Sequence, residues 1–328
     1  MIISKTPLRA SFFGGGTDFA DYYENSTLGH GAVLSTALNM HVYITVNRKF
    51  DDKIRVVYTG NELVDSVDEV KHNIIREALK FMGIEKGIEI IYMADIPLSG
   101  AGVGLASSSA LTVGVLNALH AYKGEYVSPE QLAREACHIE IDCIGQKIGI
   151  QDQYAVSFGG FNRYYFNGDG SVCVTPVVGK NIYVEILKRR LMLFFTGKTR
   201  DSRKIFEEQN ASRKDKTAML DELVKTVDYA YNSLTSGDIA IWGEVLDRTW
   251  NIKKQFASGI SSSDIDQMYA LAKEAGAVGG KILGAGGGGF MLLYVPEEKQ
   301  ETVKQALEAY RQIDLEFDAQ GSRIIFAD

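Results

Sequence analysis

Three short segments of this chain, residues 13–18, 99–110 and 284–289, are rich in glycine. One such segment is often only a tight turn, because glycine adopts backbone conformations that other residues avoid. Here each segment directly adjoins an apolar stretch that is typical of a buried helix or strand. Three glycine-rich segments that each adjoin a buried element indicate more than turns alone. They predict a fold in which several loops approach a ligand closely.

The middle segment has the chemistry of a phosphate-binding loop. Residues 99–106 carry mostly small side chains, and three serines then open an apolar helical stretch. The start of a helix offers free N–H groups and a partial positive charge, glycines let an anion approach the backbone, and hydroxyls donate hydrogen bonds or bind a cation. We therefore expect this loop to hold a phosphate group, through Gly100, Gly102, Gly104, Ser107, Ser108 and Ser109.

Two other nucleotide-binding patterns are present only in part. Residues 197–199 match the end of a P-loop, but the first glycine of that motif would be residue 192, which is Met192. The segment 284–289 has the glycine spacing of the Rossmann fingerprint, but the pattern of a strand follows it instead of a helix. Neither a P-loop nor a dinucleotide-binding fold is therefore expected.

Two acidic residues stand in apolar surroundings. In a predicted helix over 129–142, Glu140 shares one face, at spacings of three and four, with the small residues Ala133, Ala136 and Cys137. Asp152 follows in an apolar turn that contains glycine. A surface Glu and a capping Asp are one interpretation. Beside a phosphate-binding loop, two carboxylates also suggest a magnesium site and a group that orients or deprotonates a hydroxyl.

The composition narrows the class of partner. The chain has 328 residues, with 35 Lys+Arg against 42 Asp+Glu and a net charge of −7. This balance argues against nucleic acid or an anionic membrane as the main partner. Three cysteines without metal-ligand spacing predict reduced thiols, and no apolar run approaches the ~18 residues that span a bilayer. We expect a cytoplasmic protein that binds a small molecule, with a homo-oligomer as an open possibility.

The order of predicted elements indicates an α+β protein with two domains. The first half is rich in strands, and residues 54–58 are expected to form a hairpin with the strand 42–47. The second half is rich in helices. We place the boundary between residues 170 and 190, which gives domains of residues 1–180 and 181–328. Helices are expected at 70–82, 107–123, 129–142, 201–212, 217–235, 238–256, 263–275 and 297–311.

These segments, in their order along the chain, resemble the motifs of the GHMP kinase superfamily, named for galactokinase, homoserine kinase, mevalonate kinase and phosphomevalonate kinase. Residues 6–18 are similar to the first motif, 97–110 to the serine-rich nucleotide loop and 281–290 to the third motif. The separation of Glu140 from Asp152 is similar to that of the magnesium-binding Glu and catalytic Asp in galactokinase-like members. The resemblance covers essentially the whole chain. It implies a ribosomal-protein-S5-domain-2-like N-terminal domain, a ferredoxin-like C-terminal domain, and ATP and substrate between them.

The resemblance also implies roles for individual residues. Asp152 would be the catalytic carboxylate, and Arg9 beside it would keep that carboxylate ionised and stabilise the transferring phosphoryl group. Ser108 and Glu140 would bind Mg²⁺, with Ser107 or Ser109 as alternatives to Ser108. The serine-rich loop would bind ATP. The first and third motifs would contact the substrate, through Gly15, Gly16, Thr17, Asp18, Gly286 and Gly287.

Within the superfamily, residues 7–18 most resemble the kinases of D-glycero-D-manno-heptose 7-phosphate, which form the 1,7-bisphosphate on a route to nucleotide-activated heptose for surface polysaccharide. Asp18 lies where sugar-specific members bind hydroxyls. The basic segment 198–204, with Arg200 and Arg203, is a candidate for binding the 7-phosphate, and a solvated run of charge is the alternative. A kinase for fucose or galactose, and a nucleotide- and sugar-binding sensor without turnover, also remain open.

Overall fold

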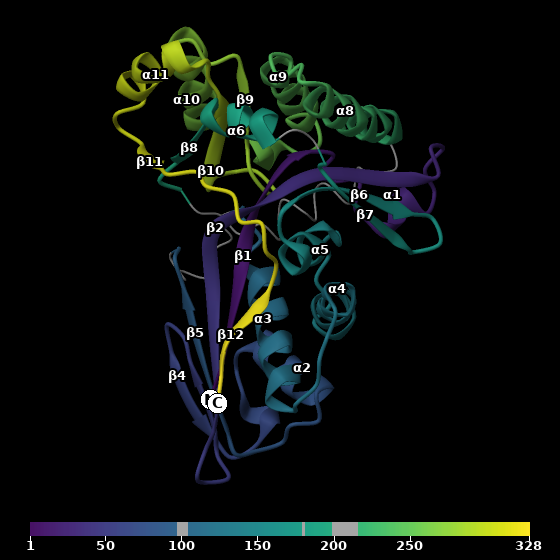
Figure 1. Ribbon diagram of the computed structural model, residues 1–328, viewed down its shortest axis with the longest axis vertical. Helices are drawn as coiled ribbons and strands as arrows, with labels where there is room; N and C mark the ends of the chain where they lie inside the picture. Colours follow the sequence, from purple (N-terminus) through teal and green to yellow (C-terminus); the bar gives the residue numbers. More distant parts are fainter. Residues whose placement is uncertain (97–103, 179–180, 199–215) are drawn as a thin grey trace.

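The computed structural model describes residues 1–96, 104–178, 181–198 and 216–328. Its strands form one sheet of eight strands and one of four, and helices lie around both (Figure 1). The first sheet occupies the lower and central part of that view, and the second its upper part. This mixture of helices and sheets confirms the α+β prediction. In the described ranges, no helix combines the length and apolar character that crossing a membrane requires.

The first sheet is built on two long antiparallel strands, β1 (Ile2–Phe13) and β2 (His30–Arg48). One end of β2 pairs with β5 and the other with β6. The last strand of the chain, β12, returns to border β1. The remaining strands of this sheet are β3 (Ile54–Val57), β4 (Asn61–Val64), β5 (Ile88–Ala94), β6 (Phe161–Asn167), β7 (Val172–Pro176) and β12 (Arg323–Ala327).

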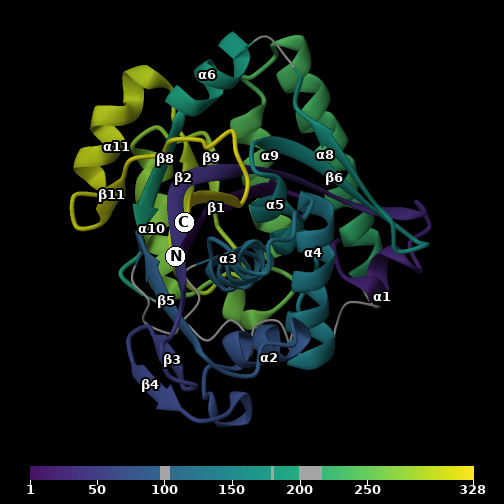
Figure 2. The same cartoon turned by 60° about the horizontal axis from the view of Figure 1, so that its bottom comes forward.

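Helix α3 (Ser107–Tyr122) packs directly on β1 and β2, with other helices beside it (Figure 2). Twelve of its 16 residues are buried, as expected for a helix that is apolar on nearly all sides. Gly114 permits the close approach, because a Cβ there would lie 3.0 Å from Thr6 Oγ1 of β1. The neighbouring helices are α2 (Asn73–Phe81), α4 (Pro129–Cys137), the π-helix η2 (His138–Cys143) and α5 (Gln151–Phe158).

The second sheet has the order β11-β8-β10-β9. Trp242 of the adjoining helix α9 is fully buried and meets Phe12 and Phe13 of β1 edge-on, at centroid distances of 5.4 and 5.1 Å. These aromatic contacts join the two halves of the chain. The elements are α6 (Asn181–Arg189), β8 (Leu191–Phe195), α8 (Thr217–Ser236), α9 (Trp242–Lys253), α10 (Ser263–Glu274), β9 (Gly279–Ile282), β10 (Phe290–Tyr294), α11 (Gln300–Ala306) and β11 (Arg311–Ile313).

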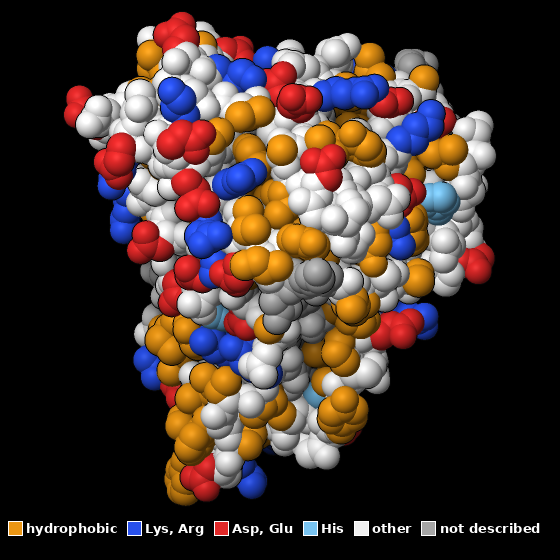
Figure 3. All heavy atoms as spheres, turned by 45° about the horizontal axis from the view of Figure 1, so that its top comes forward, with side chains coloured by type: hydrophobic (Ala, Val, Ile, Leu, Met, Phe, Trp, Pro, Cys, Tyr) orange, Lys and Arg blue, Asp and Glu red, His pale blue; other side chains and the backbone are white. Residues whose placement is uncertain are grey.

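Short helical segments complete the described chain: α1 (Ala20–Tyr23), η1 (Val67–Glu69), η4 (Ser258–Ile260) and η5 (Glu297–Lys299). The face shown in Figure 3 carries acidic and basic side chains interspersed with one another and with apolar ones. On this face neither sign of charge gathers into one large patch.

The predicted hairpin between 42–47 and 54–58 is wrong. Strand β3 pairs antiparallel with β4 and parallel with β5, and β5 lies between β3 and β2. Ile88 and Ile90 of β5 are completely buried. An apolar strand buries more surface between two neighbours than at the edge of a sheet, and this long-range gain outweighs adjacency along the chain.

Two predicted helices and one predicted turn also need correction. Helix α4 ends at Cys137 and continues as η2, so residues 138–142 of the predicted α-helix over 129–142 form a π-helix instead. Asp152 lies in the first turn of α5, not in an isolated turn. Helix α11 ends at Ala306, because the chain then turns to form β11. The predicted helix over 201–212 lies outside the described residues, and the domain limits of 1–180 and 181–328 stay a prediction.

Candidate active site

A pocket lies where β1 and the first turns of α3 and α5 meet the second half of the chain. The structure brings residues of all three glycine-rich segments to it. Its polar lining includes acids from one side and lysines from the other. The residues that line it are Arg9, Ser11, Gly15, Gly16, Asp18, Phe19, Gly104, Ala106, Ser107, Ser108, Ser109, Glu140, Gln146, Ile148, Gly149, Gln151, Asp152, Lys253, Lys281, Leu283, Gly284, Ala285, Gly286 and Gly288.

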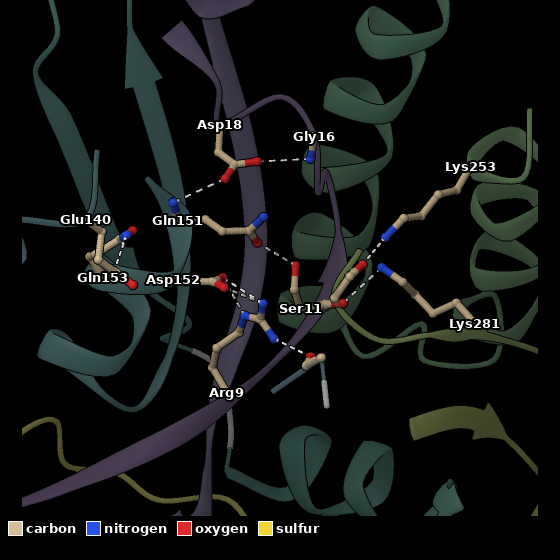
Figure 4. Close-up of polar contacts among 12 residues, drawn as sticks. Arg9, Ser11, Gly16, Asp18, Glu140, Gln151, Asp152, Gln153, Lys253 and Lys281 are labelled. Atoms are coloured by element: carbon tan, nitrogen blue, oxygen red, sulfur yellow. Dashed lines mark hydrogen bonds and ion pairs between the residues drawn. The ribbon is translucent and has the colours of Figure 1, made fainter. Parts of the chain in front are cut away.

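Arg9 and Asp152 form a two-point ion pair in this pocket (Figure 4). Arg9 Nε donates to Asp152 Oδ1 and Nη2 donates to Oδ2, each at 2.8 Å. The Arg9 side chain is 3% exposed and that of Asp152 is 26% exposed, so the carboxylate faces the pocket from a buried clamp. A guanidinium holds a carboxylate in a fixed orientation when it binds both oxygens.

Arg9 also connects this pair to the end of the middle glycine-rich loop. Its Nη1 donates to the carbonyl of Gly104 at 2.8 Å, and its backbone N–H donates to the carbonyl of Leu105 at 3.1 Å. The β1–β2 pairing shifts register between Pro7 and Leu8, directly before Arg9. Bulges of this kind redirect the side chains that follow them, which accounts for the aim of Arg9 into the pocket.

The N-terminus of α3 opens into the same pocket without a side-chain cap. The N-cap residue Ala106 adopts a left-handed conformation with φ of 63°, and its side chain makes no capping hydrogen bond to the backbone of the first turn. Non-glycine residues rarely adopt this conformation, and they do so most often at functional sites. Ser107, Ser108 and Ser109 form that first turn and line the pocket. Its backbone N–H groups are suited to an anion such as phosphate.

Glu140 is completely buried beside this helix start, on the π-helix η2. Its Oε1 accepts a hydrogen bond from Ser108 Oγ at 2.6 Å, and its Oε2 accepts one from Gln153 Nε2 at 2.7 Å. Burial raises the pKa of Glu140 above its usual range, and the hydrogen bonds from Ser108, Ser109 and Gln153 offset only part of that rise. π-Helical turns are rare and occur often at functional sites.

Ser108 and Glu140 provide a donor set that fits Mg²⁺. The hydrogen-bond partners found for Glu140 among the described residues are two hydroxyls and an amide, so this buried carboxylate lacks a cation. Mg²⁺ usually takes one or two carboxylates and completes its shell with water and phosphate oxygens. The described residues contain no cluster of three or more His, Cys, Asp or Glu suited to a metal, and a Mg²⁺ shared with phosphate needs none.

Asp18 is a second buried carboxylate that lines the pocket. Its Oδ1 accepts from the backbone N–H of Gly16 at 2.9 Å, and its Oδ2 accepts from that of Gln151 at 3.2 Å. Burial, and secondarily the charge of Asp152, raise the pKa of Asp18. A Cβ at Gly149 would lie 2.0 Å from Asp18 Oδ2, so glycine is required at that position for the carboxylate to fit.

The other predicted substrate contacts divide into two groups. Gly15, Gly16 and Gly286 line the pocket. Thr17 is completely buried, and its hydroxyl is within hydrogen-bonding distance of the carbonyls of Gly14 and Ala32. Gly287 donates its N–H to the carbonyl of Ile260 at 2.8 Å. Thr17 and Gly287 are absent from the pocket lining, and their contacts support the loops that form it.

Most of the remaining predicted site residues cannot be placed. Gly100, Gly102, Arg200 and Arg203 lie outside the described residues. Lys198 is described, and its ammonium group pairs with Asp264 in a separate pocket beside α10. Lys198 is the one residue of the basic segment 198–204 that the structure describes, and its ammonium group lies in this second pocket and does not line the first.

The pocket is also lined by two lysines to which the sequence patterns assign no role, although Lys281 lies within the third motif. Lys253 ends α9 and donates to the carbonyl of Gly284. Lys281 of β9 donates to the carbonyls of Ser11 and Phe12 at 3.0 and 3.1 Å. Burial lowers the pKa of Lys281 well below its usual range, and burial with the charge of Arg9 lowers that of Lys253 to about 8. The sequence contains one indication that Lys253 is buried, because it lies about one helical turn after Trp250 and therefore on the same face of the helix.

Two family models match this chain. The GHMP kinases N-terminal domain matches residues 70–160, and the GHMP kinases C-terminal domain matches residues 219–312. Among curated proteins, D-glycero-alpha-D-manno-heptose 7-phosphate kinase of Campylobacter jejuni is 29% identical over 340 residues, covering 98% of this chain and 97% of that protein. A mevalonate kinase of Thermococcus sibiricus is 27% identical and covers 92% of this chain and 91% of its own length.

The fold has the same relatives. The crystal structure of a D-glycero-D-manno-heptose 1-phosphate kinase from Bacteroides thetaiotaomicron matches with a TM-score of 0.82 over the whole of both chains, at 24% identity. At that identity the match bears on the fold alone. Together with the two family models, it agrees with the two-domain architecture that the motifs imply.

Proposed function

Because this chain belongs to the GHMP kinase superfamily, we propose that it phosphorylates the anomeric hydroxyl of D-glycero-D-manno-heptose 7-phosphate to give the 1,7-bisphosphate. Kinases of this superfamily use ATP with Mg²⁺, so the chain is an ATP-dependent phosphotransferase. The choice of sugar is supported by one observation above all. A relative aligned along 98% of this chain is named as a kinase of that heptose phosphate.

Asp152 is the proposed acceptor of the proton. Both of its oxygens are held by Arg9, and its side chain retains exposure to the pocket. Each carboxylate oxygen has a second lone pair, to which the anomeric hydroxyl can donate. As the hydroxyl oxygen bonds to phosphorus, its proton passes to Asp152, and the leaving group is ADP. A positioned general base of this kind typically contributes ~10²–10⁴-fold to the rate.

Arg9 is the proposed electrostatic partner of the transfer. Because guanidinium does not lose its proton at working pH, Arg9 acts as a clamp and not as a base. Its contacts with Asp152 and Gly104 place positive charge between the acceptor side and the loop side of the pocket. Negative charge that develops on the transferring phosphoryl group is stabilised by a cation fixed in advance.

Ser108 and Glu140 are the proposed protein ligands of Mg²⁺. When bound, Mg²⁺ neutralises charge on the phosphate oxygens of ATP. The first turn of α3 adds backbone donors for the same phosphates. The negative charge of the nucleotide would thus be balanced at two places. One is the Mg²⁺ site at Glu140, and the other is the uncapped start of α3 at Ser107–Ser109.

Asp18 is the proposed reader of sugar hydroxyls. Each of its oxygens accepts one backbone N–H, which orients the carboxylate and leaves further lone pairs for O–H donors. Ser11 and Gln151, whose side chains bind each other at 2.9 Å, lie next to it on the pocket wall. A site built to hydrogen-bond hydroxyls rejects analogues that lack them, because its buried polar groups are then left unpaired.

The test is ADP release from Mg·ATP with a panel of acceptors: the heptose 7-phosphate, mannose, fucose, galactose and mevalonate. We expect turnover with the phosphorylated heptose and its loss in Asp152→Ala. Turnover confined to a neutral sugar would retain the kinase and overturn the choice of substrate. Binding of ATP and sugar without ADP release from any acceptor would favour the sensor alternative.

A further inference from the structure

Lys253 is a buried cation to which none of the roles above is assigned. It is the last residue of α9, lines the pocket and is 8% exposed. Its side chain and that of Lys281 reach toward the pocket from the second half of the chain (Figure 4). The ammonium group donates to the carbonyl of Gly284, which leaves two of its three N–H groups for other acceptors.

The other cations of the pocket are better satisfied. Arg9 is bound by both oxygens of Asp152, and Lys281 donates to two carbonyl oxygens of β1. In the described part of the chain, Lys253 has no carboxylate within ion-pair distance and a single carbonyl as partner. A buried charge without a counter-charge is costly unless a ligand supplies one.

The charged groups that act on Lys253 come from three elements, β1, β9 and α5, and from the loop after β1. Arg9 of β1 and Lys281 of β9 oppose its charge, whereas Asp18 and Asp152 favour it from beyond ion-pair distance. Burial dominates, and it lowers the pKa of Lys253 to about 8. An anion in the pocket would reverse this balance and fix the proton on the lysine.

The position of Lys253 indicates which anion it would meet. Gly284, which accepts its hydrogen bond, packs against Gly104 so closely that a Cβ at Gly284 would lie 2.5 Å from Gly104 Cα. The carbonyl of Gly104 in turn accepts from Arg9. Lys253 and Arg9 therefore donate to the carbonyls of two glycines that lie against each other, and both residues line the pocket. An anion bound in the pocket beside this junction would meet two cations.

We propose that Lys253 Nζ contacts the terminal phosphoryl group of ATP during its transfer, opposite Arg9. The acceptor oxygen forms the new bond to phosphorus, while the bond from phosphorus to the β,γ-bridging oxygen breaks and leaves its electron pair on ADP. The acceptor proton goes to Asp152, and Lys253 keeps its own protons throughout. The inference rests on the class of reaction and not on the identity of the sugar.

The first measurement is calorimetric binding of Mg²⁺ complexes of ADP and of a non-hydrolysable ATP analogue that retains the terminal phosphate. In Lys253→Met, the analogue should bind on the order of 10- to 100-fold more weakly, the loss typical of a hydrogen bond to a charged group. Binding of Mg·ADP should change less than about twofold, because ADP lacks the group that Lys253 contacts. Turnover should fall on the order of 10²-fold.

Lys254→Met is the matched control. Lys254 is the adjacent residue, its side chain is 30% exposed, and it pairs with Asp266 at 3.7 Å. Neither nucleotide should bind differently in this variant. Equal weakening of ADP and analogue in Lys253→Met would reduce Lys253 to a support for Gly284. A loss confined to sugar phosphate binding would assign Lys253 to the acceptor. Either result overturns the proposal.

A second measurement on the unmodified protein does not depend on whether Lys253→Met folds. Binding of the analogue near pH 8 should take up a fraction of a proton more than binding of ADP, measured in buffers of different ionisation enthalpy. The analogue's affinity relative to ADP should therefore fall as pH rises through the pKa of about 8. Equal proton uptake for the two nucleotides would contradict the proposal.

Discussion

The two walls of the pocket carry opposite charges. The wall built by β1, the loop after it, η2 and α5 presents the carboxylates of Asp18, Glu140 and Asp152, whereas the wall built by α9 and β9 presents Lys253 and Lys281. Burial raises the pKa of Asp18 and Glu140 and lowers that of both lysines. In each case burial disfavours the charged form.

This difference shows what each wall lacks. Glu140 is short of a cation, and Lys253 is short of an anion. Mg·ATP supplies both, since the metal carries positive charge and the phosphates carry negative charge. Arg9 and Asp152 differ from both walls because they satisfy each other within the protein. Substitutions of single residues can therefore test the role of each wall separately.

The largest effect is expected for Asp152→Asn, which removes the proton acceptor and keeps its size. We expect kcat to fall by ~10²–10⁴-fold, while binding of the non-hydrolysable ATP analogue persists. Asp65→Asn is the control, because Asp65 is exposed and pairs with Lys53 far from the pocket. If Asp152→Asn retained more than a tenth of the activity, the proton would have another acceptor.

Arg9→Lys should have the next largest effect. Lysine keeps the positive charge but cannot bind both oxygens of Asp152 and the carbonyl of Gly104 in one plane. We expect kcat to fall by ~10²-fold or more, as for loss of a preorganised electrostatic group. Arg55→Lys, at a partly exposed pair with Glu89, controls for the substitution. An unchanged kcat in Arg9→Lys would show that charge alone suffices.

Glu140→Gln should separate metal binding from folding. Loss of a group that only supports a metal ligand typically lowers metal affinity by ~10–100-fold. Because Glu140 is a proposed ligand itself, the Mg²⁺ concentration for half-maximal rate should rise by at least this factor. Because the folded pKa of Glu140 is raised, its ionisation destabilises the fold as pH rises above about 4. Without Mg²⁺, the melting temperature of the variant at pH 7 should therefore exceed that of the unmodified protein. A lower melting temperature together with unchanged Mg²⁺ dependence would remove Glu140 from the metal site.

The smallest effect is expected for Lys198→Met. Lys198 belongs to the second half of the chain, as Lys253 does, but it pairs with Asp264 outside the pocket. Surface pairs of this kind contribute ~0–1 kcal/mol to stability, and we expect the KM for the sugar phosphate to change less than about twofold. A tenfold rise in that KM would assign Lys198 to the substrate site. The role of Arg200 and Arg203 in binding the 7-phosphate stays a prediction.

The features that sequence predicts well here depend on neighbours along the chain. The small-residue loop, the serines and the apolar stretch after them predict α3 and its N-terminus, since each signal lies within a few residues of the next. The spacing of Glu140 and Asp152 likewise drew attention to the two carboxylates that the structure finds in one pocket. Both are local patterns with a direct chemical meaning.

The features that sequence missed depend on distant contacts. Strand β5 separates β3 from β2 because of burial that only the assembled sheet provides. Lys253 looks like an ordinary surface lysine of a helix until α9 packs its tryptophan face against β1. The π-helix at Glu140 also has no local signal, since its residues alone fit a regular α-helix.

The most direct measurement of the central claim is ³¹P NMR of the product formed from Mg·ATP and D-glycero-D-manno-heptose 7-phosphate. We predict a second phosphate resonance coupled to the anomeric proton, appearing in step with ADP and absent with Asp152→Asn. ADP formed together with inorganic phosphate alone, or a new phosphate on any other carbon, would contradict the account.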